Sequence, residues 1–345
     1  MALIKPLCLE EGDAIGIVSP SSPVAAFCPR RFERGVQALT SLGFKVVVAD
    51  NARERYGHTA GTVEQRVNDL HAMFRDPAIK AVIATIGGFN SNQLLDRLDY
   101  DLIRTHPKIL VGYSDITALL VGIHRMTGLI TFLGPAIMPQ FGESGGLHPY
   151  TERWFRAVLL GAPGRAEVAP SLLSIHERLA WDTEDDRPRR AKRHAGPRVL
   201  KSGIAEGPIV AGNLGTMLAL AGSPYFPDLE GAILCVEEDE TESPATVDRF
   251  FTQLRLMGAF ERIAALVVGR FHPQVGFTAA DSLETLVLSV TQGFDLPVAI
   301  DFDFGHTDPM ITLPQGIRAR VDFTTGSRLE LLEQGVEKSP LTIAP

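Results

Sequence analysis

Short aliphatic runs alternate with amphipathic helical patterns along the N-terminal half of the chain, and this alternation constrains the fold most. Buried-strand patterns occupy residues 13–20, 45–49, 81–86, 108–111 and 131–133. Helical patterns lie between them, at residues 30–42, 63–74 and from 115 onward. Strands that alternate with helices of this length predict crossover connections and a mainly parallel, Rossmann-like sheet covered on both faces.

A second α/β unit follows in the C-terminal half. Strand patterns lie at residues 208–211, 232–236, 266–268 and 298–300, and helical patterns at 248–263 and 281–294. Residues 316–332 alternate, turn at Thr325-Gly326 and resume, which predicts a terminal β-hairpin. We therefore expect an α/β protein with an N-terminal domain (1–165), a connecting loop (166–206) and a C-terminal domain (207–345).

The connecting loop differs from both halves in composition. An acidic stretch at residues 182–186 precedes the arginine-rich run 187–193, and few aliphatic residues accompany them. A connection of this length without periodic structure is usually functional or disordered. We interpret the basic run as a solvated face rather than a binding patch, because the neighbouring acids partly neutralise it.

Bulk properties exclude several classes of partner. The 345 residues carry a net charge of −8, which argues against nucleic-acid polymers and anionic membranes. No apolar run is long enough to cross a bilayer, and the N-terminus lacks a signal-peptide core. Three cysteines, Cys8, Cys28 and Cys235, are an odd number without metal-like spacing. These features predict a cytoplasmic protein with reduced thiols.

Ser114 is a candidate nucleophile because of its position between a strand and a helix. It follows the strand expected at 108–111 and precedes the helical pattern that begins at Asp115. A hydroxyl there lies at the carboxyl edge of the sheet, where parallel α/β proteins bind ligands. The N–H groups at the helix start favour a developing oxyanion. The alternative interpretation is that Ser114 only caps the helix.

A serine nucleophile needs a base and a third group that orients this base. His306 lies in the turn 304–309 after the strand expected at 298–300, and Glu237 and Glu238 end another expected strand. A histidine in a turn and acidic residues at a strand end are also common in ordinary solvated positions. From position alone, these residues are therefore candidates only.

Other chemistries lack their usual spacing. A metal could in principle be held by Glu237, Glu238, Asp239, Glu240 and His306, but no His-x-Glu, Glu-x-x-His or paired-cysteine pattern accompanies them. Gly16-Ile-Val-Ser-Pro replaces the dinucleotide-binding glycine pattern, and no Gly-x-x-x-x-Gly-Lys loop occurs. Gly112-Tyr-Ser-Asp-Ile lacks the second glycine of the α/β-hydrolase elbow. We expect neither a metal nor an organic cofactor.

Ordered motifs along nearly the whole chain resemble one family. They are Gly12-Asp-Ala-Ile-Gly-Ile-Val-Ser-Pro-Ser-Ser-Pro23, Ala60-Gly-Thr-Val-Glu-Gln-Arg66, Ile86-Gly-Gly-Phe-Asn-Ser-Asn92, Gly112-Tyr-Ser-Asp-Ile-Thr117, Gly212-Asn-Leu214, Leu234-Cys-Val-Glu237, Gly305-His-Thr-Asp-Pro309 and Thr312-Leu-Pro-Gln-Gly316. Together they resemble the serine LD-carboxypeptidases, which include the microcin C self-immunity proteins.

The resemblance implies a Ser–Glu–His triad that assembles at the domain interface, in a homodimer. The nucleophile carries over to Ser114, the base to His306 and the orienting carboxylate to Glu237, with Glu238 as the alternative to test. The oxyanion donors carry over to the backbone N–H groups of Gly88 and Asp115. The substrate-binding residues implied in the same way are Gly87, Asn90, Trp181 and Asn213.

The resemblance implies two substrate classes. The parent activity releases a terminal D-amino acid from murein tetrapeptide, whereas the self-immunity branch cleaves the amide between an amino acid and a nucleotide-like group. The segments 89–92, 115–120 and 222–225 look closer to the self-immunity branch, and Trp181 resembles an aromatic residue near its nucleotide. Trp181 could equally pin the loop, and Gly196-Pro-Arg198 and the arginine-rich run depart from the family pattern.

These expectations combine into one hypothesis with two alternatives. We expect a serine amidase that acts on an aminoacyl-nucleotide. The first alternative is a murein tetrapeptide carboxypeptidase. The second, from another class, is a non-catalytic binding protein whose two lobes close on a small molecule without needing Ser114, Glu237 and His306 to meet.

Overall fold

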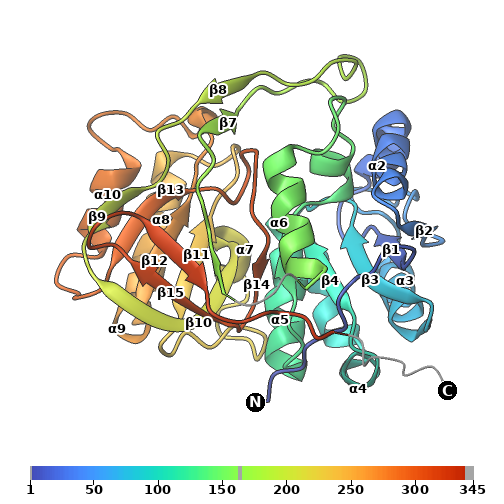
Figure 1. Ribbon diagram of the computed structural model, residues 1–345, viewed down its shortest axis with the longest axis horizontal. Coiled ribbons are helices and arrows are strands. Elements are labelled where there is room, and N and C mark those ends of the chain that lie inside the picture. The colour runs from blue at the N-terminus through green and yellow to red at the C-terminus, as the bar shows by residue number, and fades with distance from the viewer. Residues whose placement is uncertain (1, 162–164, 339–345) are drawn as a thin grey trace.

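A computed structural model describes residues 2–161 and 165–338 of the chain; the expected outer domain limits, residues 1 and 345, lie outside these ranges. Two large β-sheets lie side by side in the described residues, as the right and left halves of Figure 1 show. Helices cover both sheets, which confirms the predicted mixed α/β architecture. No helix in the described ranges is long and apolar enough to span a membrane.

The first sheet has the strand order β14-β5-β4-β3-β1-β2. Its strands are β1 (Ala14–Val18), β2 (Lys45–Val48), β3 (Ile79–Ala84), β4 (Ile109–Gly112), β5 (Phe132–Leu133) and β14 (Leu313–Pro314). All adjacent pairs are parallel except β5 with β14. The helices of this half are α1 (Val24–Phe27), α2 (Pro29–Ser41), α3 (Val63–Arg75), α4 (Tyr100–Thr105), α5 (Thr117–Thr127) and α6 (Pro149–Leu159).

The second sheet has the order β6-β16-β15-β10-β11-β12-β13-β9. Its strands are β6 (Ala166–Glu167), β9 (Arg198–Lys201), β10 (Ile204–Asn213), β11 (Ile233–Glu237), β12 (Ala265–Gly269), β13 (Val298–Phe302), β15 (Arg318–Asp322) and β16 (Arg328–Leu331). The central strands β10 to β13 are parallel, and β15 with β16 forms the predicted hairpin. The helices here are α7 (Leu214–Leu218), α8 (Pro244–Leu256), α9 (Ala259–Arg262) and α10 (Leu283–Val290).

Two sequence-based predictions need correction. The helix expected at residues 248–263 is two helices, α8 and α9, because Gly258 between them has a φ of 69° and interrupts the α-helical backbone. The connecting loop is not structureless, since it supplies β6 and β9 to opposite edges of the second sheet. It also forms a hairpin of β7 (Leu173–Ile175) with β8 (Ala191–Arg193).

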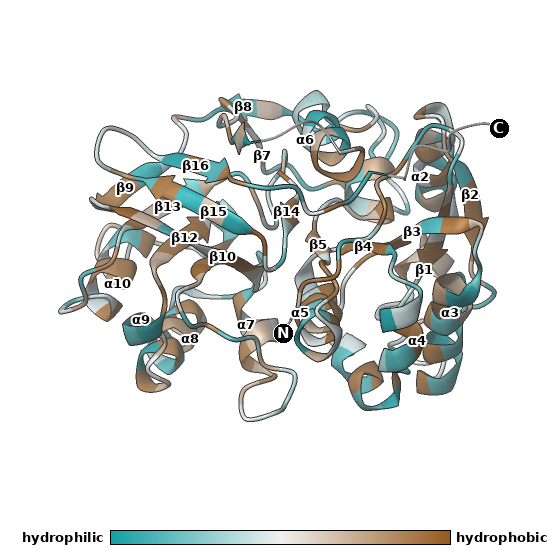
Figure 2. Cartoon of the chain, turned by 60° about the horizontal axis from the view of Figure 1, so that its bottom comes forward, coloured by the Kyte–Doolittle hydropathy of each residue, from teal (hydrophilic) through white to brown (hydrophobic). Residues whose placement is uncertain are grey.

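The segment that carries β7 and β8, residues 173–193, runs over the top of both halves in Figure 1; we call it the strap. Beneath it, the carboxyl ends of the parallel strands of both sheets supply polar loops. The strands β1, β4, β11 and β12 are mainly aliphatic and fully buried. Figure 2 shows hydrophobic colour on the inner strands of both sheets, and mixed colour on the helices and on β15 and β16. The strands therefore form the core, and the loops at their ends are available for function.

Candidate active site

Ser114 lies on the sharp turn between β4 and α5. A 3₁₀ turn, Ser114–Ile116, separates the two elements, and the N-cap of α5 is Ile116 rather than Ser114. Ser114 has a φ of 61°, in the left-handed region that non-glycine residues rarely adopt. Such strain persists where the surrounding structure enforces it, commonly at functional sites. The helix-capping interpretation of Ser114 is therefore wrong for α5.

A glycine loop after β3 packs directly against this turn. A Cβ atom at Gly87 would lie 2.7 Å from Ser114 Cβ and 3.0 Å from the Asp115 nitrogen. Gly88 has a φ of 151°, and a Cβ there would lie 2.4 Å from Ser21 Oγ. Among the hydrogen bonds of the described loops and turns, neither the Gly88 nor the Asp115 backbone N–H is a donor. Close approach of the two loops thus requires glycine at both positions.

The buried side chain of Asp115 ties three loops together. Its Oδ2 accepts hydrogen bonds from Ser21 Oγ at 2.6 Å and from the Ser91 nitrogen at 2.8 Å. Ser91 Oγ in turn donates to the Asp115 carbonyl at 2.6 Å. These bonds fix the loop after β1 and the loop after β3 around Ser114. The loop after β1, the loop after β3 and the turn of Ser114 therefore meet at the carboxyl edge of the sheet.

His306 and Glu237 form a close pair from the second sheet. His306 Nδ1 lies 2.7 Å from Glu237 Oε2, and the Glu237 side chain is fully buried at the end of β11. A Cβ atom at Gly305 would lie 2.6 Å from Glu237 Oε2, and one at Gly269 would lie 2.9 Å from Glu237 Cβ. Gly305 and Gly269 thus pack closely against the Glu237 side chain, so its carboxylate has little room to move away from the His306 imidazole.

Glu238 points elsewhere and has structural partners. Its carboxylate accepts hydrogen bonds from Asn213 Nδ2 at 2.5 Å and from the Gly215 nitrogen at 2.7 Å, at the start of α7. Burial, followed by the charge of Glu237, raises the pKa of Glu238 to about 8. Of the two neighbouring glutamates, Glu237 is therefore the one that contacts His306.

The electrostatic surroundings of His306 favour its protonated form. Burial by itself lowers the pKa of this imidazole, but the Glu237 carboxylate opposes burial through its charge and its hydrogen bond. Asp239 and Glu240 add to this effect, and the pKa of His306 is raised to about 9. The same contact assigns Nδ1 as the donor to Glu237, which leaves Nε2 as the nitrogen that can exchange a proton.

Ser114 and His306 line one pocket between the two halves, although they come from different sheets. The pocket has a volume of about 710 Å³, and Gly87, Gly88 and Tyr113 also line it. The Tyr113 ring packs against the His306 ring with centroids 5.1 Å apart. No hydrogen bond joins Ser114 to His306 within residues 2–161 and 165–338. Such contacts are commonly longer without substrate and tighten when it binds.

The residues expected to bind substrate fall into two groups. Gly87 and Trp181 line the pocket, and the Trp181 ring lies under the guanidinium of Arg31 at 4.2 Å from its centroid. Asn213 instead caps α7 through Thr216 and binds Glu238, and neither Asn213 nor Asn90 is among the described residues that line the pocket. Contact of these two asparagines with substrate stays a prediction.

Two residues that line the pocket, Phe89 and Arg189, were not predicted from the sequence to lie there. Phe89 projects from the glycine loop with 79% of its surface exposed, and Arg189 from the arginine-rich run lines the same pocket. The solvated-face interpretation of this run is wrong for Arg189, whose side chain is only 16% exposed. The sequence alone does not distinguish Arg189 from the exposed arginines beside it, because all of them belong to the same basic run. No group of three or more metal-ligating side chains was found in the described ranges.

Comparison of the chain with known proteins identifies its family. The N-terminal domain model of the LD-carboxypeptidases matches residues 15–134, and the C-terminal domain model matches residues 206–321. The chain belongs to the LD-carboxypeptidase family. It is therefore a serine peptidase, a class of hydrolase, and the resemblance noted in its motifs is confirmed.

Relatives of this LD-carboxypeptidase family member include a putative carboxypeptidase and a microcin C7 self-immunity protein. The putative carboxypeptidase YocD of Bacillus subtilis is 37% identical over 92% of this chain and 96% of its own length. The microcin C7 self-immunity protein MccF of Escherichia coli is 36% identical, with 93% of each chain covered. A solved structure of MccF without ligand has a TM-score of 0.89 at 35% identity and covers 97% of this chain and 100% of its own.

Proposed function

We propose that Ser114, His306 and Glu237 form the catalytic triad of this LD-carboxypeptidase family member. The observation that carries the proposal is the 2.7 Å contact between His306 and the buried Glu237, in a pocket that Ser114 also lines. A buried carboxylate holds an imidazole in one tautomer and stabilises the imidazolium that forms during the reaction. A non-catalytic binding protein would not need this pair beside a strained serine.

In the proposed reaction, the Ser114 hydroxyl attacks the amide carbonyl and its proton passes to His306 Nε2. The backbone N–H groups of Gly88 and Asp115 stabilise the oxyanion of the tetrahedral intermediate. His306 then donates the proton to the leaving amine, which departs and leaves an acyl-serine. Water, activated by the same imidazole, hydrolyses the acyl-serine and restores Ser114.

As substrate we propose an aminoacyl group joined by an amide to a nucleotide-like group. Two aromatic side chains, Phe89 and Trp181, line the pocket and could stack on a base. Solved structures of MccF contain adenosine monophosphate, aspartyl sulfamoyl adenosine or glutamyl sulfamoyl guanosine. The second candidate is murein tetrapeptide, because the murein tetrapeptide carboxypeptidase of Pseudomonas aeruginosa is 28% identical over 91% of this chain.

We also propose that the enzyme works in the cytoplasm as a homodimer without a cofactor. The cytoplasm is where an aminoacyl-nucleotide or an imported murein peptide would meet the enzyme. A homodimer would support this triad, because a contact between subunits that limits the relative motion of the two halves would keep Ser114 and His306 aligned.

The test is hydrolysis by the wild type and by Ser114→Ala. Aspartyl sulfamoyl adenosine and murein tetrapeptide serve as parallel substrates, and circular dichroism checks folding. We expect Ser114→Ala to fold normally and to lose nearly all turnover of both substrates, because the nucleophile is absent. Retained turnover would reject the triad. Faster hydrolysis of the tetrapeptide by the wild type would reject the aminoacyl-nucleotide as substrate.

A further inference from the structure

The arginine-rich run contains one arginine whose environment differs from that of its neighbours. The side chains of Arg187 and Arg190 are 42% and 80% exposed, whereas that of Arg189 is 16% exposed. Arg187 and Arg190 both contact Glu177 within the strap itself. Arg189 instead points under the strap, into the interface between the two halves. A surface charge run does not require this arrangement.

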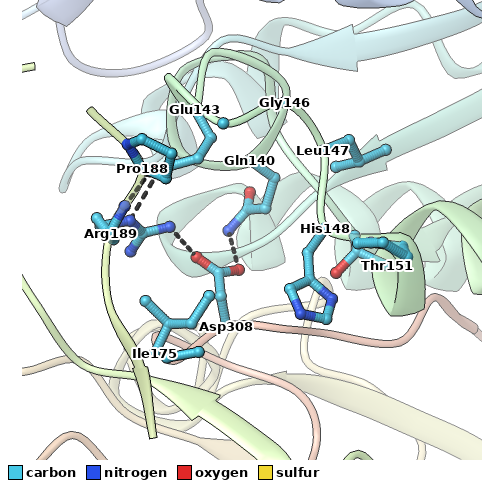
Figure 3. Close-up of a pocket in the computed structure, with 13 residues that line it drawn as sticks. Gln140, Glu143, Gly146, Leu147, His148, Thr151, Ile175, Pro188, Arg189 and Asp308 are labelled. Carbon is cyan, nitrogen blue, oxygen red and sulfur yellow. Dashed lines mark hydrogen bonds and ion pairs between the residues drawn. The ribbon is translucent and has the colours of Figure 1, made fainter. Parts of the chain in front are cut away.

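The guanidinium of Arg189 joins the strap to both halves. Its Nε donates to Glu143 Oε2 at 2.8 Å, and its Nη2 donates to Asp308 Oδ2. Glu143 follows the π-helical turn Ile137–Phe141 of the first half, and Asp308 stands two residues after His306. Figure 3 shows Arg189 between these two carboxylates, with Gln140 on the other oxygen of Asp308.

The contacts of Asp308 lead to the catalytic groups. Gln140 Nε2 donates to Asp308 Oδ1 at 3.1 Å and lies 3.3 Å from the Tyr113 hydroxyl. Tyr113 directly precedes Ser114, and its ring packs on His306. The strap contacts Asp308 a second time, through the Ile175 nitrogen and the Asp308 carbonyl at 2.7 Å. The strap therefore holds the turn of His306 at two points, from Ile175 at the end of β7 and from Arg189 just before β8.

The charges explain why Asp308 depends on Arg189. Glu143 has a second cation, Arg31, at 2.9 Å, so it stays paired without Arg189. Asp308 is 6% exposed, and Arg189 is its ion-pair partner among the described residues. A buried carboxylate without a counter-charge is strongly unfavourable, and the turn that carries it would move toward water. That movement would displace His306, two residues away.

The Arg189–Asp308 pair is also a wall between two cavities. Both residues line the active-site pocket and a second pocket of about 180 Å³, whose lining appears in Figure 3. Gln140 and Ile175 line both pockets as well. Loss of the pair would therefore open the active-site pocket at the turn that carries His306.

We propose that Arg189 is a positioning residue, which clamps the strap to Asp308 and thereby aligns His306 with Ser114. The proposal rests on the triad proposed above. It makes strap closure part of the catalytic assembly: His306 is aligned only while Arg189 holds Asp308 and Glu143 together. Arg189 itself does not touch the reacting atoms.

The first measurement is the rate at which an uncharged fluorophosphonate labels Ser114, whose oxygen displaces fluoride from phosphorus. Because the probe has no carboxylate, a role of Arg189 in binding a substrate carboxylate would leave the rate unchanged. We expect Arg189→Met to label about 10²-fold more slowly, since a displacement near 1 Å costs about that factor. Arg189→Lys should recover part of the rate. Arg190→Met, which removes an exposed charge one residue away, should label as the wild type does.

The second measurement is hydrogen exchange of residues 304–310, which needs no activity. We expect faster exchange there in Arg189→Met and unchanged exchange in Arg190→Met. Arg189→Met combined with Asp308→Asn should regain thermal stability, because no buried charge is left unpaired, but not the labelling rate. Wild-type exchange in Arg189→Met, or recovery of labelling in the double variant, would overturn the proposal. If Arg189→Met exchanges faster than the wild type at residues 304–310 but the wild type itself is never labelled, the triad is rejected and not the role of Arg189.

Discussion

His306 Nδ1 lies 2.7 Å from Glu237 Oε2, across a separation of 69 residues in the chain. Glu237 ends β11, and His306 follows β13, two strands away in the same sheet. The next residue, Glu238, is directed to the start of α7 instead. Successive side chains of a strand point to opposite faces, so two adjacent glutamates reach different partners.

Glu237→Gln should lower kcat by about 10⁴-fold, because an amide cannot hold the imidazole in its productive tautomer or stabilise its charged form. Glu238→Gln should cost less than about tenfold, because the raised pKa of Glu238 already makes this group largely neutral near pH 7. Steady-state kinetics of both variants, with circular dichroism as the folding control, make the comparison. The opposite ranking would assign the orienting carboxylate to Glu238.

The activity should depend on pH through His306. The general base must be neutral, and the pKa of His306 is raised to about 9 despite burial, because Glu237, Asp239 and Glu240 surround it with negative charge. The value of kcat/KM should therefore rise with pH, with a midpoint above the ordinary value of about 6.5. Glu240→Gln, which removes one carboxylate without touching the triad, should move the midpoint to lower pH and increase activity at neutral pH. A midpoint at or below 6.5 in the wild type, or no movement in the variant, would contradict this assignment.

The glycine loop should tolerate no side chain at Gly87. A Cβ atom there would lie 2.7 Å from Ser114 Cβ, so Gly87→Ala must push the loop and the nucleophile apart. We expect kcat/KM to fall by about 10²-fold, the usual consequence of a misplaced reacting group. The matched control is Gly326→Ala, where a Cβ would meet nothing within 4 Å. Equal activity of the two variants would show that the loop yields without cost.

Local patterns predicted the elements around Ser114 because aliphatic runs and helical periodicity are properties of short segments. They could not predict β14, a strand of two residues whose partner β5 lies far away in the chain. They could not separate Arg189 from Arg190 either, because burial of Arg189 depends on Glu143 and Asp308 from two distant loops. For the same reason, the choice between Glu237 and Glu238 required the family resemblance before the fold was known.

Substitution of Trp181 should affect hydrolysis of the two candidate substrates differently. The Trp181 ring lines the active-site pocket and stacks on Arg31, so it could both bind a base and pin the strap. If it stacks on a base, Trp181→Ala should weaken hydrolysis of aspartyl sulfamoyl adenosine by about 1–3 kcal/mol, which is about 5- to 150-fold in kcat/KM. Hydrolysis of murein tetrapeptide, which has no base, should change far less.

Trp181→Phe is the control that separates stacking from pinning. A smaller aromatic ring keeps a face for the base and for the Arg31 guanidinium, so this variant should retain much of the activity on the adenosine substrate. Pinning of the strap would affect every substrate alike, because it acts through the shape of the pocket. An equal loss on both substrates in Trp181→Ala would therefore assign Trp181 to the strap and remove this support for an aminoacyl-nucleotide substrate.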